Sequence, residues 1–299
     1  MPFTVIDGIA TRYDIVGSGP PLLMFSPGGF DATLEKWTTL GVYSRTRLLQ
    51  HLAAHYTCIV FDRRETGQSG GRVESVRWSY YVTQAKGLLD HLHIDRAHLA
   101  GGCMGCSPVL SFGVMHPETT LSMVLYWPVG GAKYRISSQK RFADHLAYVE
   151  EHGLSGVVSL VLQEGKPFNA EPRGGPWAAV IKADASFAAS FARMDTDRYR
   201  QLVSDMARIL FDRDTAPGAE PEDLLRSAIP ALVVPGQDAS HATSAARYLE
   251  ECLPRAQYWD VPAAEQTELN APARVLEFLN GCAISTDDAP RTTAAGARG

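Results

Sequence analysis

A cysteine inside a glycine-rich run is the first feature of this sequence that could do chemistry. Cys103 is the central residue of GGCMG, residues 101–105, which follows an apolar run and precedes a stretch with helical periodicity. Glycines two positions before and after a residue allow a sharp strand-to-helix turn, because a Cβ atom there would collide with nearby backbone. The turn holds the sulfur at a helix N-terminus, which lowers the pKa of a thiol from about 8.5. The pattern predicts a nucleophilic thiolate; the alternative is a buried cysteine with a structural role.

A second cysteine, Cys106, gives the pair the spacing of a redox motif. A Cys-x-x-Cys pair at a helix N-terminus is typical of thiol–disulfide exchange. That chemistry needs neither flanking glycines nor a large helical insertion, so we favour a Cys106 that packs one turn into the helix. A zinc site has less support, because no second Cys/His pair follows at metal-binding spacing.

Composition limits the classes of partner. The 299 residues carry a net charge of −5, and the charged residues are scattered along the chain. This distribution lacks the basic face of proteins that bind nucleic acids or anionic membranes. We therefore expect a small-molecule substrate, uncharged or weakly polar, with no nucleic-acid partner and no membrane partner. A homodimer is compatible with the sequence.

Targeting and cofactor signals are missing from the sequence patterns. Residues 1–17 show no basic stretch followed by an apolar one, and no apolar run approaches the ~18 residues of a membrane span. The five cysteines are an odd number, which favours reduced thiols over a disulfide framework. These features predict a cytoplasmic protein. No phosphate loop, metal cluster or dinucleotide fingerprint occurs, so we expect no cofactor and no metal.

The elements that must position the cysteine alternate along the chain. Short apolar runs alternate with longer runs of helical periodicity, which is typical of a mostly parallel sheet flanked by helices. The predicted strands are 4–16 (a hairpin around 7–8), 21–25, 57–61, 97–100, 122–127, 231–234 and 257–261. The predicted helices between them are 44–55, 80–91, 107–116, 243–252 and 271–279.

One interval breaks this rhythm. Between residues 130 and 226 the sequence predicts helical segments at 139–151, 154–163, 177–191 and 198–211 but no strand. We therefore predict an α/β core from residues 1–129 and 227–284, with residues 130–226 inserted as a helical cap. Residues 285–299 are small and polar and have nothing to bury, which predicts a disordered tail.

Four local patterns occur in the order and spacing of a known family. They are LLMFSPGGFDATLEKW at 22–37, FDRRETGQSGG at 61–71, GGCMG at 101–105, and IPALVVPGQD, which ends at Asp238. With these patterns the chain resembles the α/β-hydrolase family over essentially all its ordered length. The resemblance implies that fold, with a mostly parallel central sheet flanked by helices and an inserted helical cap.

The resemblance also implies roles for particular residues. GGCMG matches Gly-x-nucleophile-x-Gly with Cys103 in place of the usual serine, a nucleophile also found in dienelactone hydrolases. The N–H groups of Gly29 and Met104 correspond to the oxyanion hole. Asp238 stands at the position of the triad acid, although it could instead cap the following helix. The run at 61–71 is similar to Asp-x-Arg-Gly-x-Gly-x-Ser, and we expect its charged residues to brace the site through ion pairs.

The chain departs from the family pattern at the catalytic histidine. That residue ordinarily follows the last strand, but here no histidine occurs after His241. Glu265, seven residues before Pro272, occupies its register. His241 lies three residues after Asp238 and could reach Cys103 from the neighbouring loop. Either Asp238 or Glu265 would then orient the imidazole. Each residue also has a structural alternative. His241 could be an exposed residue at the start of the next helix, and Glu265 could be an ordinary surface residue of a polar loop.

Glu265 could also act without the histidine. Direct transfer of a proton from a thiol to a carboxylate crosses a gap of about four pKa units, roughly 5 to 6 kcal/mol, unless burial closes it. Glu265 would therefore serve better as an acid with a raised pKa, or as the base that activates water against a thioester. The sequence leaves open whether His241 or Glu265 is the base.

Aromatic residues are candidates for the substrate pocket. Phe30, Trp127, Tyr134 and Trp177 would line it if the cap folds over the cysteine, although aromatic residues of a helical insertion often form its own core. We predict a hydrolase that uses Cys103 on a lactone, enol ester, thioester or cyclic amide of a small apolar substrate. One alternative is a cofactor-free lyase or C–C bond hydrolase on the same fold. Another is a ligand-binding protein without catalysis.

Overall fold

The chain begins with the predicted hairpin. The computed structural model describes residues 1–282, and its first strands are β1 (Phe3–Ile6) and β2 (Ile9–Val16). Asp7 and Gly8 join them with positive φ angles of 49° and 72°, as a two-residue type I′ turn requires. β2 then pairs antiparallel with β4 (Thr57–Phe61), which connects the hairpin to the main sheet.

The other strands continue the sheet in parallel. They are β3 (Pro21–Phe25), β5 (Ala97–Gly102), β6 (Thr120–Tyr126), β7 (Ala231–Val234) and β8 (Ala256–Tyr258). The order in the sheet is β1-β2-β4-β3-β5-β6-β7-β8, and all neighbours from β4 onward are parallel. The predicted fold class is confirmed. The carboxyl ends of the parallel strands share one edge, where open α/β sheets place their ligand sites.

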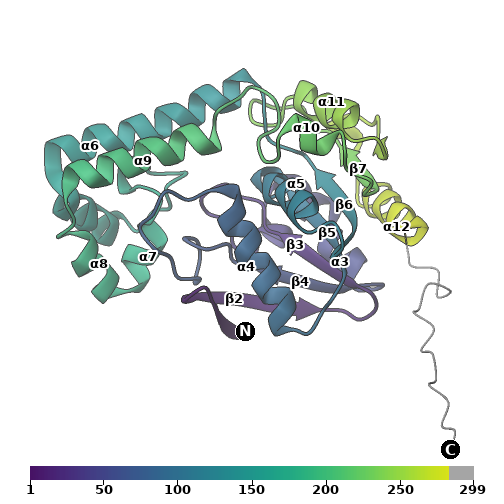
Figure 1. Ribbon diagram of the computed structural model, residues 1–299, viewed down its shortest axis with the longest axis horizontal. Coiled ribbons are helices and arrows are strands. Elements are labelled where there is room, and N and C mark those ends of the chain that lie inside the picture. The colour runs from purple at the N-terminus through teal and green to yellow at the C-terminus, as the bar shows by residue number, and fades with distance from the viewer. Residues whose placement is uncertain (283–299) are drawn as a thin grey trace, which may run out of the picture.

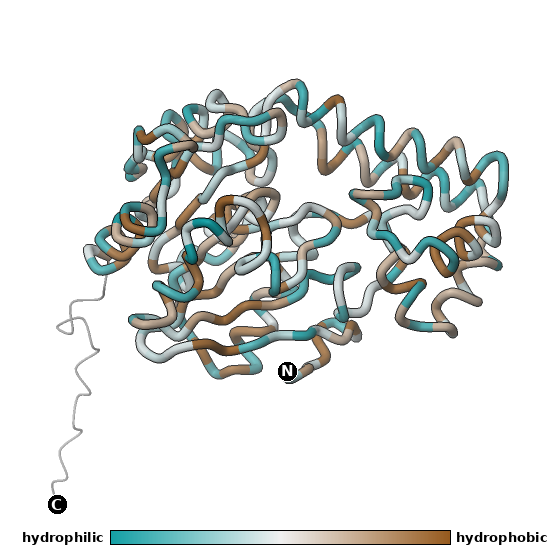
Figure 2. Tube along the Cα trace, turned by 180° about the vertical axis from the view of Figure 1, so that it is seen from behind, coloured by the Kyte–Doolittle hydropathy of each residue, from teal (hydrophilic) through white to brown (hydrophobic). Residues whose placement is uncertain are grey.

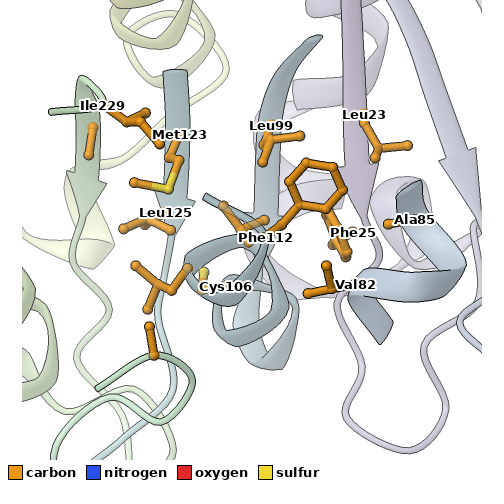
Figure 3. Close-up of a cluster of buried hydrophobic side chains, with 14 of the residues drawn as sticks. Leu23, Phe25, Val82, Ala85, Leu99, Cys106, Phe112, Met123, Leu125 and Ile229 are labelled. Atoms are coloured by element: carbon orange, nitrogen blue, oxygen red, sulfur yellow. The ribbon is translucent and has the colours of Figure 1, made fainter. Parts of the chain in front are cut away.

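Helices cover both faces of this sheet (Figure 1). One face carries α4 (Trp78–His91), α5 (Cys106–Met115) and α11 (Thr243–Cys252), and the other carries α1 (Lys36–Thr39), α2 (Gly41–Thr46), α3 (Leu48–Ala53) and α12 (Ala271–Gly281). Figure 3 shows the first face, where Phe25 and Leu99 of the sheet meet Val82 and Phe112 of the helices. Each face therefore has its own apolar cluster, and the sheet is buried between them.

The helix predicted at 44–55 is wrong in its continuity. The structure has two short helices there, α2 and α3, and Arg47 between them is left-handed, with φ of 47°. A left-handed residue cannot continue a right-handed helix, so the chain changes direction at this point.

The interval between β6 and β7 forms a separate layer of helices. These are α6 (Ala132–Glu164), α7 (Ala178–Ala183), α8 (Ala185–Phe191), α9 (Thr196–Leu210) and α10 (Pro221–Leu224). α6 consists of two helices that meet at a kink at Gly153, where φ is 66° and ψ is 177°, so the two separate segments predicted at 139–151 and 154–163 are confirmed. α6 and α9 run side by side (Figure 1). In Figure 2 the colour of α6 alternates between teal and brown, as in an amphipathic helix with one buried side.

Two sequence-based expectations concern features beyond this fold. The tail predicted at 285–299 lies outside the described residues. Among residues 1–282, no helix combines the length and the apolar character that a membrane span requires.

Candidate active site

Cys103 lies at a sharp turn between β5 and α5. It opens the short 3₁₀ turn Cys103–Gly105 with φ of 54°, a left-handed conformation that costs a non-glycine residue about 1–3 kcal/mol. A Cβ atom on Gly101 would lie 2.5 Å from the carbonyl oxygen of Gly105, and one on Gly105 would lie 2.4 Å from that of Phe25. Both glycines are therefore required by backbone contacts. We call this turn, residues 101–105, the elbow.

The loop after β7 carries a histidine and its carboxylate partner. Asp238 Oδ1 accepts hydrogen bonds from the backbone N–H of Ser240 at 2.8 Å and of His241 at 3.0 Å. The same carboxylate lies 2.8 and 2.9 Å from Nδ1 of the His241 ring. The aspartate thus shapes the turn and orients the imidazole that follows three residues later, so this pairing is built locally.

Contacts with the loop after β6 place that histidine in the site. The N–H of Gly130 donates to the carbonyl oxygen of Ser240 at 3.0 Å, and the N–H of Ala242 donates to that of Gly130 at 3.3 Å. The His241 ring lies 5.5 Å from the Trp127 ring, centroid to centroid. A Cβ atom on Gly236 would collide with His241 at 2.5 Å, so the glycine leaves room for this position.

The electrostatics favour a thiolate–imidazolium pair. Burial disfavours the thiolate, but the hydrogen bond and charge of His241 outweigh it and hold the pKa of Cys103 below that of an ordinary thiol. Burial would likewise lower the pKa of His241, but Asp238 and Cys103 together raise it to about 10. The hydrogen bond from His241 lowers the pKa of Asp238 to about 2. His241 Nε2 is buried and has no hydrogen-bond partner by geometry in the described chain, so its contact with the Cys103 sulfur is seen in the mutual pKa shifts of the two groups.

Two backbone amides also stabilise the sulfur anion. They belong to Gly28 and Met104, whose hydrogen bonds lower the pKa of Cys103. The sequence predicted Gly29 instead of Gly28. Gly29 does line the cavity beside Cys103, but its carbonyl oxygen accepts a hydrogen bond from Arg63.

Asn169, in the helical interval between β6 and β7, contacts this amide loop. The side-chain amide of Asn169 donates to the carbonyl oxygen of Gly28, and its oxygen accepts from the N–H of Phe30 at 3.4 Å. A Cβ atom on Gly29 would lie 3.1 Å from the same amide. Sequence reasoning missed Asn169, because nothing in the cap pattern marks it.

Glu265 does not lie with the cysteine and the histidine. It ends the short 3₁₀ turn Ala263–Glu265, its side chain is exposed, and it is not among the residues that line the cavity. The next residue, Gln266, is fully buried instead. Its Oε1 accepts from Trp127 Nε1 at 2.7 Å, and its Nε2 donates to the carbonyl oxygen of Pro235 at 2.8 Å. The register from Pro272 identified the loop but was one residue away from the side chain that points inward.

A cavity of about 250 Å³ opens above the elbow between the core and the cap. Its lining residues are Gly28, Gly29, Phe30, Cys103, Met104, Tyr134, Arg141, Asn169, Phe211, Ser240 and His241. Phe30 and Tyr134 line it, as the sequence predicted. Trp127 does not, because its indole packs against His241 and bonds to Gln266. Trp177 is fully buried among the cap helices and donates to the carbonyl oxygen of Arg72 at 2.9 Å.

Cys106 is part of the hydrophobic core and not of the cavity. Its thiol donates to the carbonyl oxygen of Gly101 at 3.1 Å, and burial raises its pKa well above the usual value. Figure 3 shows it among apolar side chains that include Leu125 and Phe112. An inert, buried thiol of this kind does not support the redox alternative for the Cys103–Cys106 pair.

The charged loop after β4 behaves only partly as expected. Arg64 Nε bonds to Glu65 Oε1 at 2.8 Å, and Arg64 also pairs with Glu74. Glu65 has φ of 66° at a position where the resembled pattern has glycine, and its buried ion pair holds it there. Arg63 is 1% exposed and has no carboxylate partner in the described chain. Arg141, which lines the cavity, also makes no ion pair in the described chain. A charged residue of this helix was not predicted at the site from the sequence.

Comparisons with known proteins agree with this architecture. A sequence model of the family described as alpha/beta hydrolase fold matches residues 21–265. A 2-hydroxy-6-oxo-6-phenylhexa-2,4-dienoate hydrolase of Comamonas testosteroni is 47% identical over 120 residues, which are 40% of this chain and 40% of that protein. The dihydrolipoyllysine-residue acetyltransferase component of the acetoin cleaving system of Cupriavidus necator is 30% identical over 128 residues, 43% of this chain and 32% of that protein. The chain thus matches less than half the length of these curated relatives.

Solved structures resemble the chain over nearly all of its length. The α/β hydrolase MGS-M2 from a Medee basin deep-sea metagenome library has a TM-score of 0.60 at 18% identity, covering 93% of this chain and 97% of that one. The enol-lactonase from Burkholderia xenovorans LB400 has a TM-score of 0.59 at 19% identity, covering 93% of this chain and 100% of that one. These identities speak for the fold alone. Because the family model also spans most of the sequence, the chain belongs to the α/β-hydrolase fold family.

Proposed function

We propose that the protein is a thiol hydrolase in which Cys103 is the nucleophile, His241 the general acid and base, and Asp238 the residue that orients the imidazole. The observation that carries this proposal is the line of groups from the Asp238 carboxylate through the His241 ring to the Cys103 sulfur. Nucleophile, base and orienting group in such a relay are the general signature of covalent catalysis. Here base and acid share one loop.

The proposed reaction begins with the thiolate. Cys103 attacks the carbonyl carbon of the substrate, and the amides of Gly28 and Met104 stabilise the oxyanion of the tetrahedral intermediate. The C–S bond stays as the bond to the leaving group breaks, and the imidazolium of His241 gives that group its proton. Neutral His241 then takes a proton from water, whose oxygen attacks the thioester. The acid is released and the thiolate–imidazolium pair is restored.

The choice of sulfur points to activated carbonyl groups. A thiolate attacks well but also leaves readily from a tetrahedral intermediate, so the other leaving group must be at least as good. Lactones, enol esters and thioesters meet this condition, whereas simple amides do not. The cavity of about 250 Å³ is below the range of about 300–1,000 Å³ that is usual for drug-sized ligands, which supports a small substrate.

A second candidate is hydrolysis of a carbon–carbon bond. It is favoured by the relative that hydrolyses 2-hydroxy-6-oxo-6-phenylhexa-2,4-dienoate and is 47% identical over 120 residues. The 6-oxo group named there is a ketone, and a ketone can be hydrolysed only by breaking a C–C bond. In this chemistry His241 would move the protons, and no acyl adduct on Cys103 would be needed.

Alkylation of the thiol tests the first proposal. Iodoacetamide at neutral pH should label Cys103 rapidly, and mass spectrometry of peptides identifies the site. Cys282 is the matched control, because it is also partly exposed but burial raises its pKa. Cys103 should react at least about tenfold faster than Cys282, since the thiolate is the reactive species.

Acyl capture then separates the candidate functions. With a panel of small lactones and p-nitrophenyl esters, the wild type should turn over at least one compound and Cys103→Ala none. Cys103→Ser should react slowly or accumulate an ester adduct detectable by mass. Turnover that survives Cys103→Ala would contradict covalent catalysis and favour C–C bond hydrolysis. An unreactive Cys103 with no turnover of any compound would favour a ligand-binding protein.

A further inference from the structure

We propose that the cavity recognises a carboxylate on the substrate, and that Arg141 of α6 binds it. The proposal rests on the proposed function for the identity of the reacting atom, because it adds a specificity-determining contact to the same site. It differs from the uncharged substrate expected from the scattered charges of the whole chain. A net charge of −5 describes the average surface and not the local field of one cavity.

The first observation is that Arg141 has no counter-ion. It lines the cavity together with Cys103, and in the described chain it makes neither an ion pair nor a side-chain hydrogen bond. Several charged residues of the same interval are paired: Arg173 binds Glu171 through two nitrogens at 2.8 and 2.7 Å, and Lys140 binds Asp144 at 2.7 Å. Arg141 is half-buried, whereas the other basic residues of this interval that make no ion pair in the described chain are exposed: Lys133, Lys182, Arg193 and Arg198. An arginine left free within a cavity can therefore bind an anion from outside the chain, because its planar fork fits a carboxylate.

The second observation is that no acidic residue among residues 1–282 lines the cavity. Its polar lining consists of Tyr134, Asn169, Ser240 and backbone besides the cysteine, the histidine and the arginine. Asp238 is the acidic side chain that contributes to the site, and the His241 ring occupies its carboxylate. An anionic ligand would thus meet no carboxylate in the lining, and the negative charge of the Cys103 thiolate is balanced by the imidazolium of His241.

The third observation is a buried arginine behind the cavity. Arg63 is 1% exposed, its guanidinium lies 5.0 Å from the centroid of the Tyr81 ring, and it donates to the carbonyl oxygen of Gly29. Its Nε and Nη1 atoms have no partner in the described chain. The nearby carboxylate of Glu65 is bound to Arg64. Arg63 therefore adds uncompensated positive charge next to the loop that carries the amide of Gly28.

The charges of the site show which arginine serves the ligand. In the ion-pair state Asp238 and the Cys103 thiolate are negative, and His241 and Arg63 are positive, so these four groups cancel. Arg141 then remains as the unneutralised charge of the cavity. A substrate that carries one carboxylate as well as its reactive carbonyl group would restore neutrality in the cavity.

A pair of alkylating reagents tests this without knowledge of the substrate. Iodoacetate and iodoacetamide have nearly the same size and reactive carbon, but only iodoacetate carries a carboxylate. The ratio of their rate constants for Cys103, iodoacetate over iodoacetamide, should fall at least about tenfold in Arg141→Met, as expected for loss of a hydrogen bond to a charged group. In Arg141→Lys this ratio should lie between those of the wild type and Arg141→Met, because lysine keeps the positive charge but lacks the planar guanidinium that binds both carboxylate oxygens.

Lys140→Met is the matched control. It removes one positive charge from the adjacent position of the same helix, but the Lys140 side chain is 70% exposed and points away to Asp144. Its ratio should stay within about twofold of the wild type, since exposed charges are screened by solvent. A ratio in Arg141→Met that equals that of Lys140→Met overturns the proposal, even if both variants label normally and the proposed thiol chemistry stands.

Equilibrium binding covers the case in which the thiol proves unreactive. Benzoate should raise the Tm of the wild type and of Cys103→Ala, benzamide should not, and Arg141→Met should abolish the benzoate effect. This pattern supports the carboxylate site even if Cys103 is not a nucleophile. Equal effects of benzoate and benzamide, or a benzoate effect that persists in Arg141→Met, overturn the proposal independently of the catalytic role.

Discussion

The loops after β7 and β8 lie at the same edge of the sheet, but they carry very different side chains. The first holds Asp238 and His241, which bond to each other and extend toward Cys103. The second holds Glu265, which is exposed, and Gln266, which is buried and bonds to Trp127. Trp127 packs against His241, so the two loops meet through this indole. In the proposed mechanism, one loop supplies the reactive groups and the other supports them.

On the proposed mechanism, the orienting acid and the base share one loop. Three residues of chain suffice, because the Asp238 carboxylate accepts from the backbone N–H of His241 and from its ring at once. The short loop costs little conformational entropy to order, and the bridge to Gly130 fixes its direction. The loop after β8 can then carry an amide that satisfies backbone carbonyl groups.

Removal of the base should have the largest effect. His241→Ala should lower turnover of an activated ester by about 10²–10⁴-fold, because the general acid and base is lost. It should also slow iodoacetamide labelling of Cys103 at pH 7 by about tenfold or more, because an ordinary thiol is only a few per cent ionised there. Glu265→Gln, the counterpart on the other loop, should leave both rates within about twofold. Ester turnover and Cys103 labelling, measured under the same conditions in both variants, test the assignment of His241 as the base. A larger loss of turnover in Glu265→Gln than in His241→Ala would contradict it.

Loss of the orienting carboxylate should have an intermediate effect. Asp238→Asn should lower turnover by about tenfold to a hundredfold, in line with a lost hydrogen bond to a charged group. The pKa of Asp238 is about 2 in the folded chain against about 3.9 unfolded, so its contribution to stability is present above about pH 4 and lost as the pH falls through about 2.

Thermal unfolding measures this pH dependence. The Tm difference between wild type and Asp238→Asn should shrink from about pH 5 toward pH 2, while His241 is protonated in both folded and unfolded chains over that range. Glu265→Gln again serves as the control on the other loop. A Tm difference that stays constant across the range would show that the carboxylate is not held ionised by the histidine.

The supporting loop should matter for stability more than for reactivity. Gln266→Leu leaves Trp127 Nε1 and the carbonyl oxygen of Pro235 without their partners, which should lower the free energy of unfolding by about 1–3 kcal/mol. Labelling of Cys103 should change by less than about threefold. Urea unfolding together with the alkylation rate separates the two effects. A collapse of labelling as large as in His241→Ala would mean that the loops cannot be assigned separate tasks.

Much of the fold could be predicted because its signals are local. The strands from residues 21 to 25, 57 to 61 and 231 to 234 were predicted with their final bounds, since each is an apolar run between turn residues. The division of α6 into two helical pieces, predicted at 139–151 and 154–163, is also confirmed, because two helices meet there at a kink at Gly153. This signal is local too, since a glycine can take the non-helical geometry of the kink at little cost.

The sequence by itself determined the elbow at Cys103, because a Cβ atom on Gly101 would collide with the backbone of Gly105 only four residues later. The need for glycine at 105 itself comes from the close approach of Phe25 on β3. The sequence also brought Asp238 and His241 together, since they are three residues apart. Only the tertiary structure decided that Gln266 points inward in place of Glu265, and that Arg141 of the cap reaches the cavity of the core. These placements join segments far apart in the chain, and their register depends on packing between layers that no local pattern encodes.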